Sequence, residues 1–244
     1  MLTRRSFVAL ALALAPLLAA HQPALADTPA PAEPQEPKKK PTAAVLYFDN
    51  LGESEELFAL RKGLTQMLIS DLSYGTGFNL VERTRLQDII DELELGQSKK
   101  IDPATAAKIG KLLGADYLVM GGYFEMRGSM RIDVRVVAVE TGVIVKSLGA
   151  TGKGDDFFAV QQELAQGLTK VMETLTPIPA NPNPAKPRPT VPKKVKTKTA
   201  ARYGKALDLV DKGDKEGAKK ELQAVVEEAP DFGLASDDLA SLMR

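Results

Sequence analysis

Three carboxylates lie where the predicted strands of this chain begin or end, and they are the side chains best placed to do chemistry. Asp49 ends the first predicted strand, Glu82 follows the second and Asp116 precedes the third. Two carboxylates that flank a glycosidic bond can cleave it when one of them is held in a desolvated pocket. The same side chains are typical of turns and helix starts, and Asp49 with Asn50 fits that role better. Their separation is not visible in the sequence, so both interpretations stay open.

Most other catalytic chemistry is excluded by residues that the chain lacks. Its single histidine, His21, lies in a segment that we expect to be removed, and it has no cysteine. Histidine-dependent and cysteine-dependent catalysis, disulfides and thiolate zinc sites are therefore excluded. The segment Gly121-Gly122-Tyr123 lacks the spacing of a phosphate-binding loop and predicts a close approach of two backbones within a strand. We expect no catalytic residue, cofactor, metal site or small-molecule substrate.

Residues 1–26 have the pattern of an export signal. Arg4 and Arg5 precede an apolar run, and Ala24-Leu25-Ala26 supplies the small residues of a cleavage site. The mature protein is therefore predicted to begin at Asp27 in the periplasm. The paired arginines also fit a twin-arginine signal, so the general secretory and twin-arginine routes both stay open.

Proline-rich segments separate the folded parts of the chain. Residues 27–41 are rich in proline and lysine and predict a disordered tether, and residues 177–199 predict a semi-rigid linker of the same character. Their lysines are solvated or make weak contact with an anionic envelope surface. The chain has 32 basic and 32 acidic residues, so it lacks the charge of a nucleic-acid-binding protein.

Residues 42–176 alternate between strand and helix patterns. Apolar runs predict strands at 43–48, 78–81, 117–124, 131–136 and 143–148. Three- and four-residue apolar spacing predicts helices capped by Ser54, by Thr84 with Gln87, and by Asp102 before Pro103, with a last helix over 157–175. The order β-α-β-α-α-β-β-β-α predicts an α/β fold with a mixed sheet packed against helices.

Several segments of this region carry a family resemblance. They are Ala43-Ala44-Val45-Leu46-Tyr47-Phe48-Asp49, Val81-Glu82-Arg83-Thr84, Leu113-Gly114-Ala115-Asp116-Tyr117 and Val139-Glu140-Thr141-Gly142. They resemble the CsgG family, the curli production assembly and transport components of the bacterial envelope, and more distantly the amino-terminal domain of TolB. The resemblance implies this α/β fold and an assembly role in the periplasm or at the outer membrane, without catalysis.

The same resemblance implies structural roles for the polar residues at the strand ends. Arg83 is expected to pair with a carboxylate near those ends, and Asp49, Glu82 and Asp116 to hold the loops. Members of the family are typically lipoproteins. Since this chain has no cysteine to carry a lipid, we expect at most a peripheral association with the outer membrane.

Residues 200–244 resemble a single tetratricopeptide repeat. Ala206, Gly213-Asp214, Ala218, Leu222 and Pro230 stand at the repeat's spacing. An ordinary helical hairpin is the alternative. One repeat buries too little apolar area to be stable alone, so a partner or another folded surface is expected to cover five apolar side chains: Leu207, Val210, Leu222, Val225 and Phe232.

These patterns predict a non-enzymatic envelope protein that acts in protein assembly or scaffolding. Its partners would be envelope proteins or further copies of itself. Two alternatives from other classes are an oligomeric curli-type secretion channel component and a carboxylate-dependent peptidoglycan hydrolase. The channel alternative requires long alternating hairpins with an apolar outward face, and the hydrolase alternative requires a cleft that holds the carboxylates together.

Overall fold

The computed structural model describes residues 39–95, 101–176, 178 and 195–244. The predicted signal, most of the tether over 27–41 and most of the linker over 177–199 lie outside these residues. From Lys38 to Arg244 the chain forms one compact unit.

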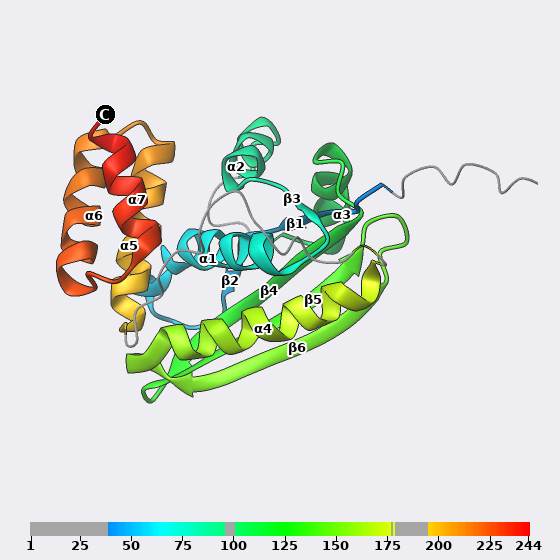
Figure 1. Cartoon of the computed structure of the whole chain (residues 1–244), viewed down its shortest axis with the longest axis horizontal. Coiled ribbons are helices and arrows are strands. Elements are labelled where there is room, and N and C mark those ends of the chain that lie inside the picture. The colour runs from blue at the N-terminus through cyan, green and yellow to red at the C-terminus, as the bar shows by residue number, and fades with distance from the viewer. Residues whose placement is uncertain (1–38, 96–100, 177, 179–194) are drawn as a thin grey trace, which may run out of the picture. The chain divides into compact units, whose positions relative to one another are not determined.

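A mixed sheet forms the centre of this unit (Figure 1), as the sequence predicted. The strands run in the order β3-β1-β4-β5-β6, with β2 also paired to β4. The pairs β1–β3, β1–β4 and β2–β4 are parallel, and β4–β5 and β5–β6 are antiparallel. The bounds are β1 Thr42–Val45, β2 Asp49–Asn50, β3 Asn79–Leu80, β4 Tyr117–Met126, β5 Ser129–Ala138 and β6 Ile144–Lys153.

The single first strand predicted over 43–48 is wrong, because β1 ends at Val45 and β2 begins at Asp49. The backbone between them bonds to helix side chains. The Thr65 hydroxyl donates to the Leu46 carbonyl at 2.9 Å, and Arg61 Nε donates to the Phe48 carbonyl at 3.0 Å. These carbonyls are therefore satisfied outside a strand ladder.

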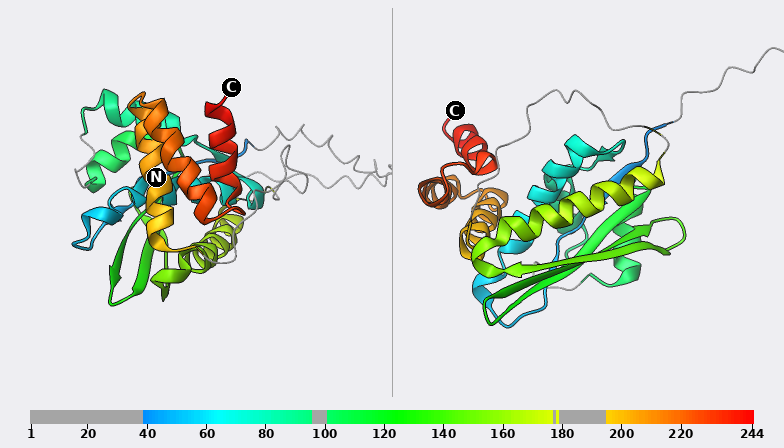
Figure 2. Two further views of the ribbon diagram at one scale, coloured as in Figure 1. Left: turned by 90° about the vertical axis from the view of Figure 1, so that its left-hand side faces the viewer. Right: turned by 60° about the horizontal axis from the view of Figure 1, so that its bottom comes forward.

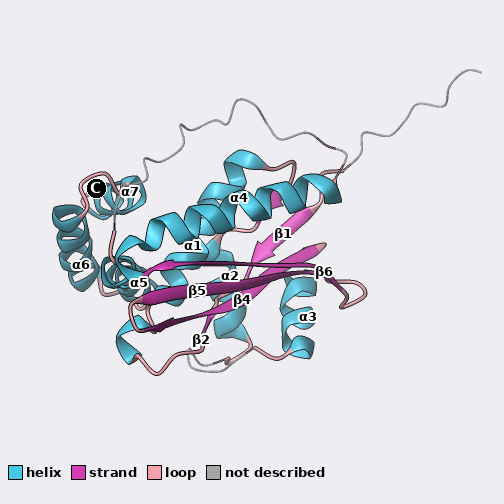
Figure 3. Ribbon diagram, turned by 90° about the horizontal axis from the view of Figure 1, so that it is seen from below, coloured by secondary structure: helices cyan, strands magenta, loops and turns pink. Residues whose placement is uncertain are grey.

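Helices cover both faces of the sheet (Figure 3). On one face, α1 and α4 bury an apolar core that includes Val119, Ile132, Val134 and Val136. On the other, α2 and α3 bury a smaller core around Ala44, Leu46 and Leu118. The bounds are α1 Leu60–Gly75, α2 Arg83–Glu92, α3 Pro103–Leu112 and α4 Phe157–Leu175, with short 3₁₀ helices at Glu55–Leu57 and Gly154–Asp156.

One of the three predicted helix caps is formed. Asp102 accepts hydrogen bonds from the backbone N–H groups of Ala104 and Thr105 at 2.9 and 3.0 Å. Ser54 instead precedes the 3₁₀ helix without a side-chain cap bond. The capping box of Thr84 with Gln87 is also wrong: α2 begins at Arg83, and Gln87 bonds to Tyr47 and Asp91.

Three helices pack on the rest of the unit (Figure 2), and the first begins at Thr197, before the predicted end of the linker at 199. They are α5 Thr197–Asp211, α6 Lys215–Glu228 and α7 Gly233–Leu242, and we call them the helical module. Phe232, just before α7, stacks edge-on against Tyr203 of α5 and Phe158 of α4, with ring centroids 4.8 and 4.9 Å apart. The module and the α1–α4 layer therefore share one apolar core.

Gly121 confirms the close backbone approach expected within a strand. A Cβ at this position would lie 2.0 Å from the Asp133 carbonyl oxygen on β5 and 3.0 Å from the Phe48 ring. We expect Gly121→Ala to lower the free energy of unfolding by about 1–3 kcal/mol, measured by urea denaturation. Gly52→Ala is the control, since its Cβ would meet nothing closer than 3.5 Å. Equal effects of the two changes would contradict this reading.

Candidate functional site

The strand-end carboxylates are separated along the sheet. Asp49 on β2 lies beside Gly122 of β4, whereas Asp116 precedes Tyr117 at the start of β4. At about 3.3 Å per residue the strand advances about 17 Å between those two neighbours. Glycosidase carboxylates lie about 5–9.5 Å apart. Asp49 and Asp116 therefore do not form the pair that the hydrolase alternative requires.

Asp116 instead ties strands together. Its carboxylate accepts a hydrogen bond from the Thr42 N–H at 2.7 Å, and its own N–H donates to the Thr42 carbonyl at 2.8 Å. Its carbonyl accepts from the Val139 N–H at 2.9 Å. These bonds join β1 and β4 to the residue that follows β5. Glu82 is exposed at the start of α2 and forms no side-chain cap bond.

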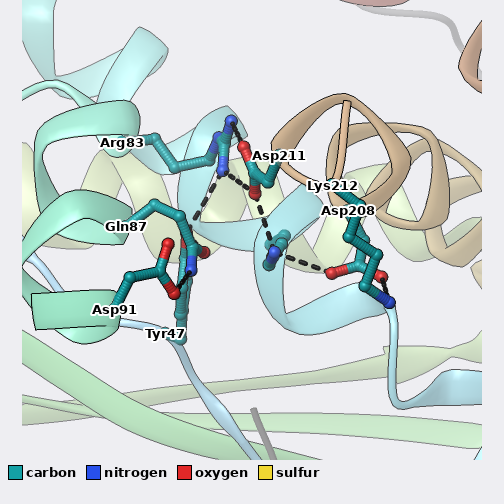
Figure 4. A network of polar contacts seen from close by, with 8 residues as sticks. Tyr47, Arg83, Gln87, Asp91, Asp208, Asp211 and Lys212 are labelled. Carbon is teal, nitrogen blue, oxygen red and sulfur yellow. Dashed lines mark hydrogen bonds and ion pairs between the residues drawn. The ribbon is translucent and has the colours of Figure 1, made fainter. Parts of the chain in front are cut away.

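Arg83 pairs with a carboxylate from a part of the chain that sequence reasoning did not connect to it. Its guanidinium donates two hydrogen bonds to Asp211 of α5, at 2.7 and 2.8 Å, and a third to the Tyr47 hydroxyl at 3.2 Å (Figure 4). Asp49, Glu82 and Asp116 are not its partners in these bonds. The expected pairing near the strand ends is therefore corrected: Arg83 fastens the helical module to the sheet-bearing part.

A second cation extends this polar network. Lys62 of α1 donates to Asp211 at 2.7 Å and to Asp208 at 2.8 Å, and the other Asp208 oxygen bonds to Lys212 at 2.6 Å. The Tyr47 hydroxyl donates to Gln87 at 2.8 Å, and Gln87 donates to Asp91 at 2.8 Å. We call this set of eight residues the latch: Tyr47, Lys62, Arg83, Gln87, Asp91, Asp208, Asp211 and Lys212.

The centre of the latch is largely shielded from water, whereas Asp91 and Lys212 at its ends are exposed. The side chains of Arg83, Lys62 and Asp211 are 4%, 8% and 9% exposed. Burial raises the pKa of Tyr47 to about 12. For Arg83, burial is the largest single effect and opposes the charged form, but the hydrogen bonds that Arg83 donates to Asp211 and Tyr47, together with the charges of both groups, outweigh it and raise the pKa above its usual value. Both groups therefore keep their protons at neutral pH, so Arg83 stays charged and Tyr47 stays a donor.

A local signal for the latch is present in the sequence. Lys62 lies in the first turn of α1, and Asp208 and Asp211 lie in the last turn of α5. Each charge has the sign that its own helix dipole disfavours. Placed against each other, the two helix ends offset both mismatches. Acidic residues in the last turn of one helix and basic residues in the first turn of another therefore suggest that two such helix ends are in contact. They do not specify which helices form the contact.

Two glycines let α1 and α5 cross closely next to the latch. A Cβ on Gly204 would lie 1.9 Å from the Ala59 carbonyl oxygen, and one on Gly63 would lie 3.0 Å from the Ala200 carbonyl oxygen. Backbone therefore meets backbone at this crossing, as small residues at helix contacts allow. The latch fixes the polar side of the junction, and the glycines fix the distance between the helices.

The residues proposed to bind a partner lie within the chain's own core. Leu207, Leu222, Val225 and Phe232 are 6%, 0%, 0% and 2% exposed and belong to the core shared with α1 and α4. Val210 is half-buried. The expectation that another protein covers these side chains is corrected, because the chain itself covers them. These side chains are therefore not available to bind a partner while the module is docked.

Asp238 of α7 is a partly buried carboxylate whose charge weakens this core at neutral pH. It accepts a hydrogen bond from the Tyr203 hydroxyl at 2.8 Å. Burial raises the pKa of Asp238, although the bond from Tyr203 and the charge of Arg83 act in the opposite direction. When the pKa of a carboxyl group is higher in the folded than in the unfolded state, the folded state loses stability as the pH rises from the unfolded-state pKa through the folded-state pKa.

We therefore expect Asp238→Asn to raise the free energy of unfolding at neutral pH. The gain should shrink in acid, where the wild-type carboxyl is protonated in both the folded and the unfolded state. Urea denaturation at several pH values measures the difference, with Asp237→Asn on the exposed side of α7 as the control. A destabilised Asp238→Asn variant at neutral pH would show that the ionised carboxylate is needed.

Part of the sheet face that carries α2 and α3 is left open. Gly122, Asp133 and Gly149 stand side by side on β4, β5 and β6. The absence of side chains on the glycines leaves a shallow groove of about 440 Å³. Asp133 leans over Gly149, where it accepts two hydrogen bonds from Arg131 at 2.7 and 2.8 Å. The open face is therefore polar and bordered by arginines.

Neither a metal-binding cluster nor a membrane-spanning helix is present among the residues that the structure describes. Within the ranges given above, no group of three or more acidic, histidine or cysteine side chains is arranged to hold a metal ion. Among the helices of those ranges, none combines the length and the apolar character of a membrane span.

The comparison with protein families gives a match that includes strands β1 to β4 and ends before β5. Residues 28–127 match the family described as curli production assembly/transport component CsgG. The CsgG resemblance is confirmed. The CsgG segment runs from the tether before β1 to the turn after β4. It therefore includes the latch residues Tyr47, Lys62 and Arg83, but not the helical module that they hold.

Solved structures with a similar fold come from bacterial proteins. The C-terminal domain of LpoB from Salmonella enterica has a TM-score of 0.41 and 18% identity, over 46% of this chain and 82% of that chain. Lipoprotein GNA1162 from Neisseria meningitidis has a TM-score of 0.41 and 13% identity, over 55% of this chain and 99% of that chain. TolB from Acinetobacter baumannii has a TM-score of 0.35 and 15% identity, over 59% of this chain and 30% of that chain.

A curated relative has a different description. The chain is 25% identical over 154 residues to "Putative adenylate cyclase 3" of Rhizobium meliloti (strain 1021). The match covers 63% of this chain and 24% of that protein, so the chain spans about a quarter of its relative's length.

Proposed function

We propose that this chain is an exported, non-enzymatic envelope protein that works in assembly or scaffolding by contacting other proteins. The observation that carries the proposal is the CsgG match over residues 28–127. The site supports it, because Asp116 and Arg83 make structural contacts and Asp49 lies far from Asp116 along β4. The match supports a place in the periplasm or at the outer membrane, with envelope proteins or further copies as partners.

The described lysines of the tethers fit a secondary role at most. Lys39 and Lys40 are exposed, and Lys198 forms an exposed ion pair with Glu56 at 2.9 Å. Exposed ion pairs contribute little stability, so these cations stay available for weak contact with an anionic envelope surface. The tetratricopeptide likeness of α5 and α6 stays part of the proposal, with the module acting as a fixed cap on the CsgG segment.

Fractionation of the cell envelope tests the proposal. We expect the mature protein to begin at Asp27, to leave the cell with the periplasmic contents, and to elute in a complex heavier than one copy. An intact leader, or a protein found in the cytoplasm, would refute it. Replacing Arg4 and Arg5 with lysine separates the two export routes: unchanged export indicates the general secretory route.

The channel alternative predicts a different outcome of the same preparation. Oligomers released only by detergent, together with conductance across a planar bilayer, would favour a secretion channel component over a scaffold. A heavy complex that is released without detergent and shows no conductance would favour the scaffold.

A further inference from the structure

Strand β6 is a long edge of the sheet whose outer side has no strand partner within the described residues. It pairs with β5 along its inner side only, over Ile144 to Lys153. The opposite edge, β3, is only two residues long. Long edges are usually protected against pairing with other chains, because their unpaired backbone N–H and C=O groups form a template for another strand.

The beginning of this edge is apolar and exposed. Val143, Ile144 and Val145 are 60%, 51% and 39% exposed. Three consecutive exposed apolar residues are unfavourable in water unless something covers them. The edge is therefore unprotected at this end.

A small pocket lies next to the exposed residues. Ala106 and Ala107 of α3, Met120 of β4, Val137 of β5 and Ile144 of β6 enclose about 130 Å³. Small-molecule sites measure about 300–1,000 Å³, so this pocket suits one apolar side chain rather than a whole ligand. It reaches the edge of the sheet at Ile144.

The charges on the edge strand itself are positive. Lys146 and Lys153 are the only charged residues of β6, and both are exposed. On β5, Arg131 is paired with Asp133, whereas Arg135 forms no ion pair within the described ranges and lines the apolar pocket. A second copy would place its own basic β6 against this one, and like charges across a strand pair are destabilising. The charges therefore favour an acidic occupant over a second copy.

We propose that the β6 edge binds an extended acidic segment of another protein as an added strand, with one apolar side chain of that segment in the pocket beside Ile144. In this mode backbone hydrogen bonds supply affinity, and side-chain pockets supply specificity. The inference rests on the proposed function and deepens it, because it names the surface of the scaffold and the chemistry of its partner.

A labelled peptide in which glutamate alternates with valine, with leucine at its centre, tests the proposal by fluorescence anisotropy. We expect binding by the whole mature chain. Two versions of the peptide are N-methylated at alternate residues, one in each phase. The version whose methyl groups replace the N–H groups that face β6 should not bind, and the version whose methyl groups face away from β6 should still bind. A version with lysine in place of glutamate should bind at least about tenfold more weakly. No binding of the acidic peptide, or equal binding of all four peptides, would overturn the proposal.

Three variants locate the site on the protein. Ile144→Asp should abolish binding, and Ala107→Leu should weaken it by filling the pocket. Arg135→Glu should weaken binding of the acidic peptide and strengthen binding of the lysine peptide. Circular dichroism confirms that each variant is folded, and Lys170→Glu on α4 serves as a charge control.

The remaining outcomes separate this inference from the proposed function. Concentration-dependent dimers that Ile144→Asp dissolves would overturn it in favour of a second copy on the edge. A periplasmic complex that survives Ile144→Asp would leave the scaffold function standing and refute this surface. A cytoplasmic protein that still binds the acidic peptide would refute the proposed function and keep the surface.

Discussion

Replacing Asp211 with alanine should release the helical module from the rest of the chain. The change leaves Arg83 without its bidentate partner and removes one of the two carboxylates that bind Lys62, at side chains only 4% and 8% exposed. Removing one partner of a buried ion pair costs about 3–5 kcal/mol. We expect urea denaturation to show that loss, and amide hydrogen exchange in α5 to rise before exchange in β4 and β5.

Two further variants make this prediction specific. Asp231→Ala removes an exposed aspartate between α6 and α7 and should change stability little. The double variant Arg83→Met with Asp211→Leu removes both charges, and it should recover part of the loss because apolar replacement of a buried pair is often neutral. A double variant less stable than Asp211→Ala alone would mean that the latch is stabilising as an ion pair.

Substitution of Gly204 by leucine should have a comparable effect for a different physical reason. The Cβ atom alone would lie 1.9 Å from the Ala59 carbonyl oxygen and 3.0 Å from the Gly63 backbone nitrogen. Because both obstacles are backbone atoms, the helices have to separate. We expect a loss of more than about 3 kcal/mol, at the upper end of overpacking effects, and a smaller loss for Gly204→Ala.

Lys205→Leu is the matched control on the next residue of α5. It removes only an exposed ion pair with Glu221, worth less than about 1 kcal/mol. Limited proteolysis of the region around Val195 reports undocking directly. A Gly204→Leu variant as resistant to cleavage as Lys205→Leu would show that the crossing tolerates a side chain.

Local patterns predicted the elements of the fold well. Apolar alternation in β5 and three- and four-residue spacing in α4 each depend on neighbours in the sequence. Asp102 before Pro103 predicted a helix start because its side chain can reach only the next few N–H groups. The break between β1 and β2 was missed, because it depends on hydrogen bonds from Thr65 and Arg61, which lie on α1.

The latch could not be predicted in the same way. Arg83 and Asp211 are 128 positions apart, and nothing in the residues around Arg83 specifies a partner on α5. The sequence did show that the module needs a covering surface, but the choice between its own chain and another protein depends on the glycine crossing and on the charges at two helix ends. Those features have meaning only once both helices are placed.

The covalent connection between the module and the CsgG segment changes how strong their contact has to be. A linker that lets two parts of one chain meet holds them at an effective concentration on the order of 1 mM. Parts that bind each other as separate molecules with a Kd of about 10 μM would then be docked about 99% of the time. Lengthening the linker lowers the effective concentration of the module roughly as the −3/2 power of the linker length, without changing any contact residue. The linker and the latch therefore set together how often the module is docked, the linker through the effective concentration and the latch through the Kd.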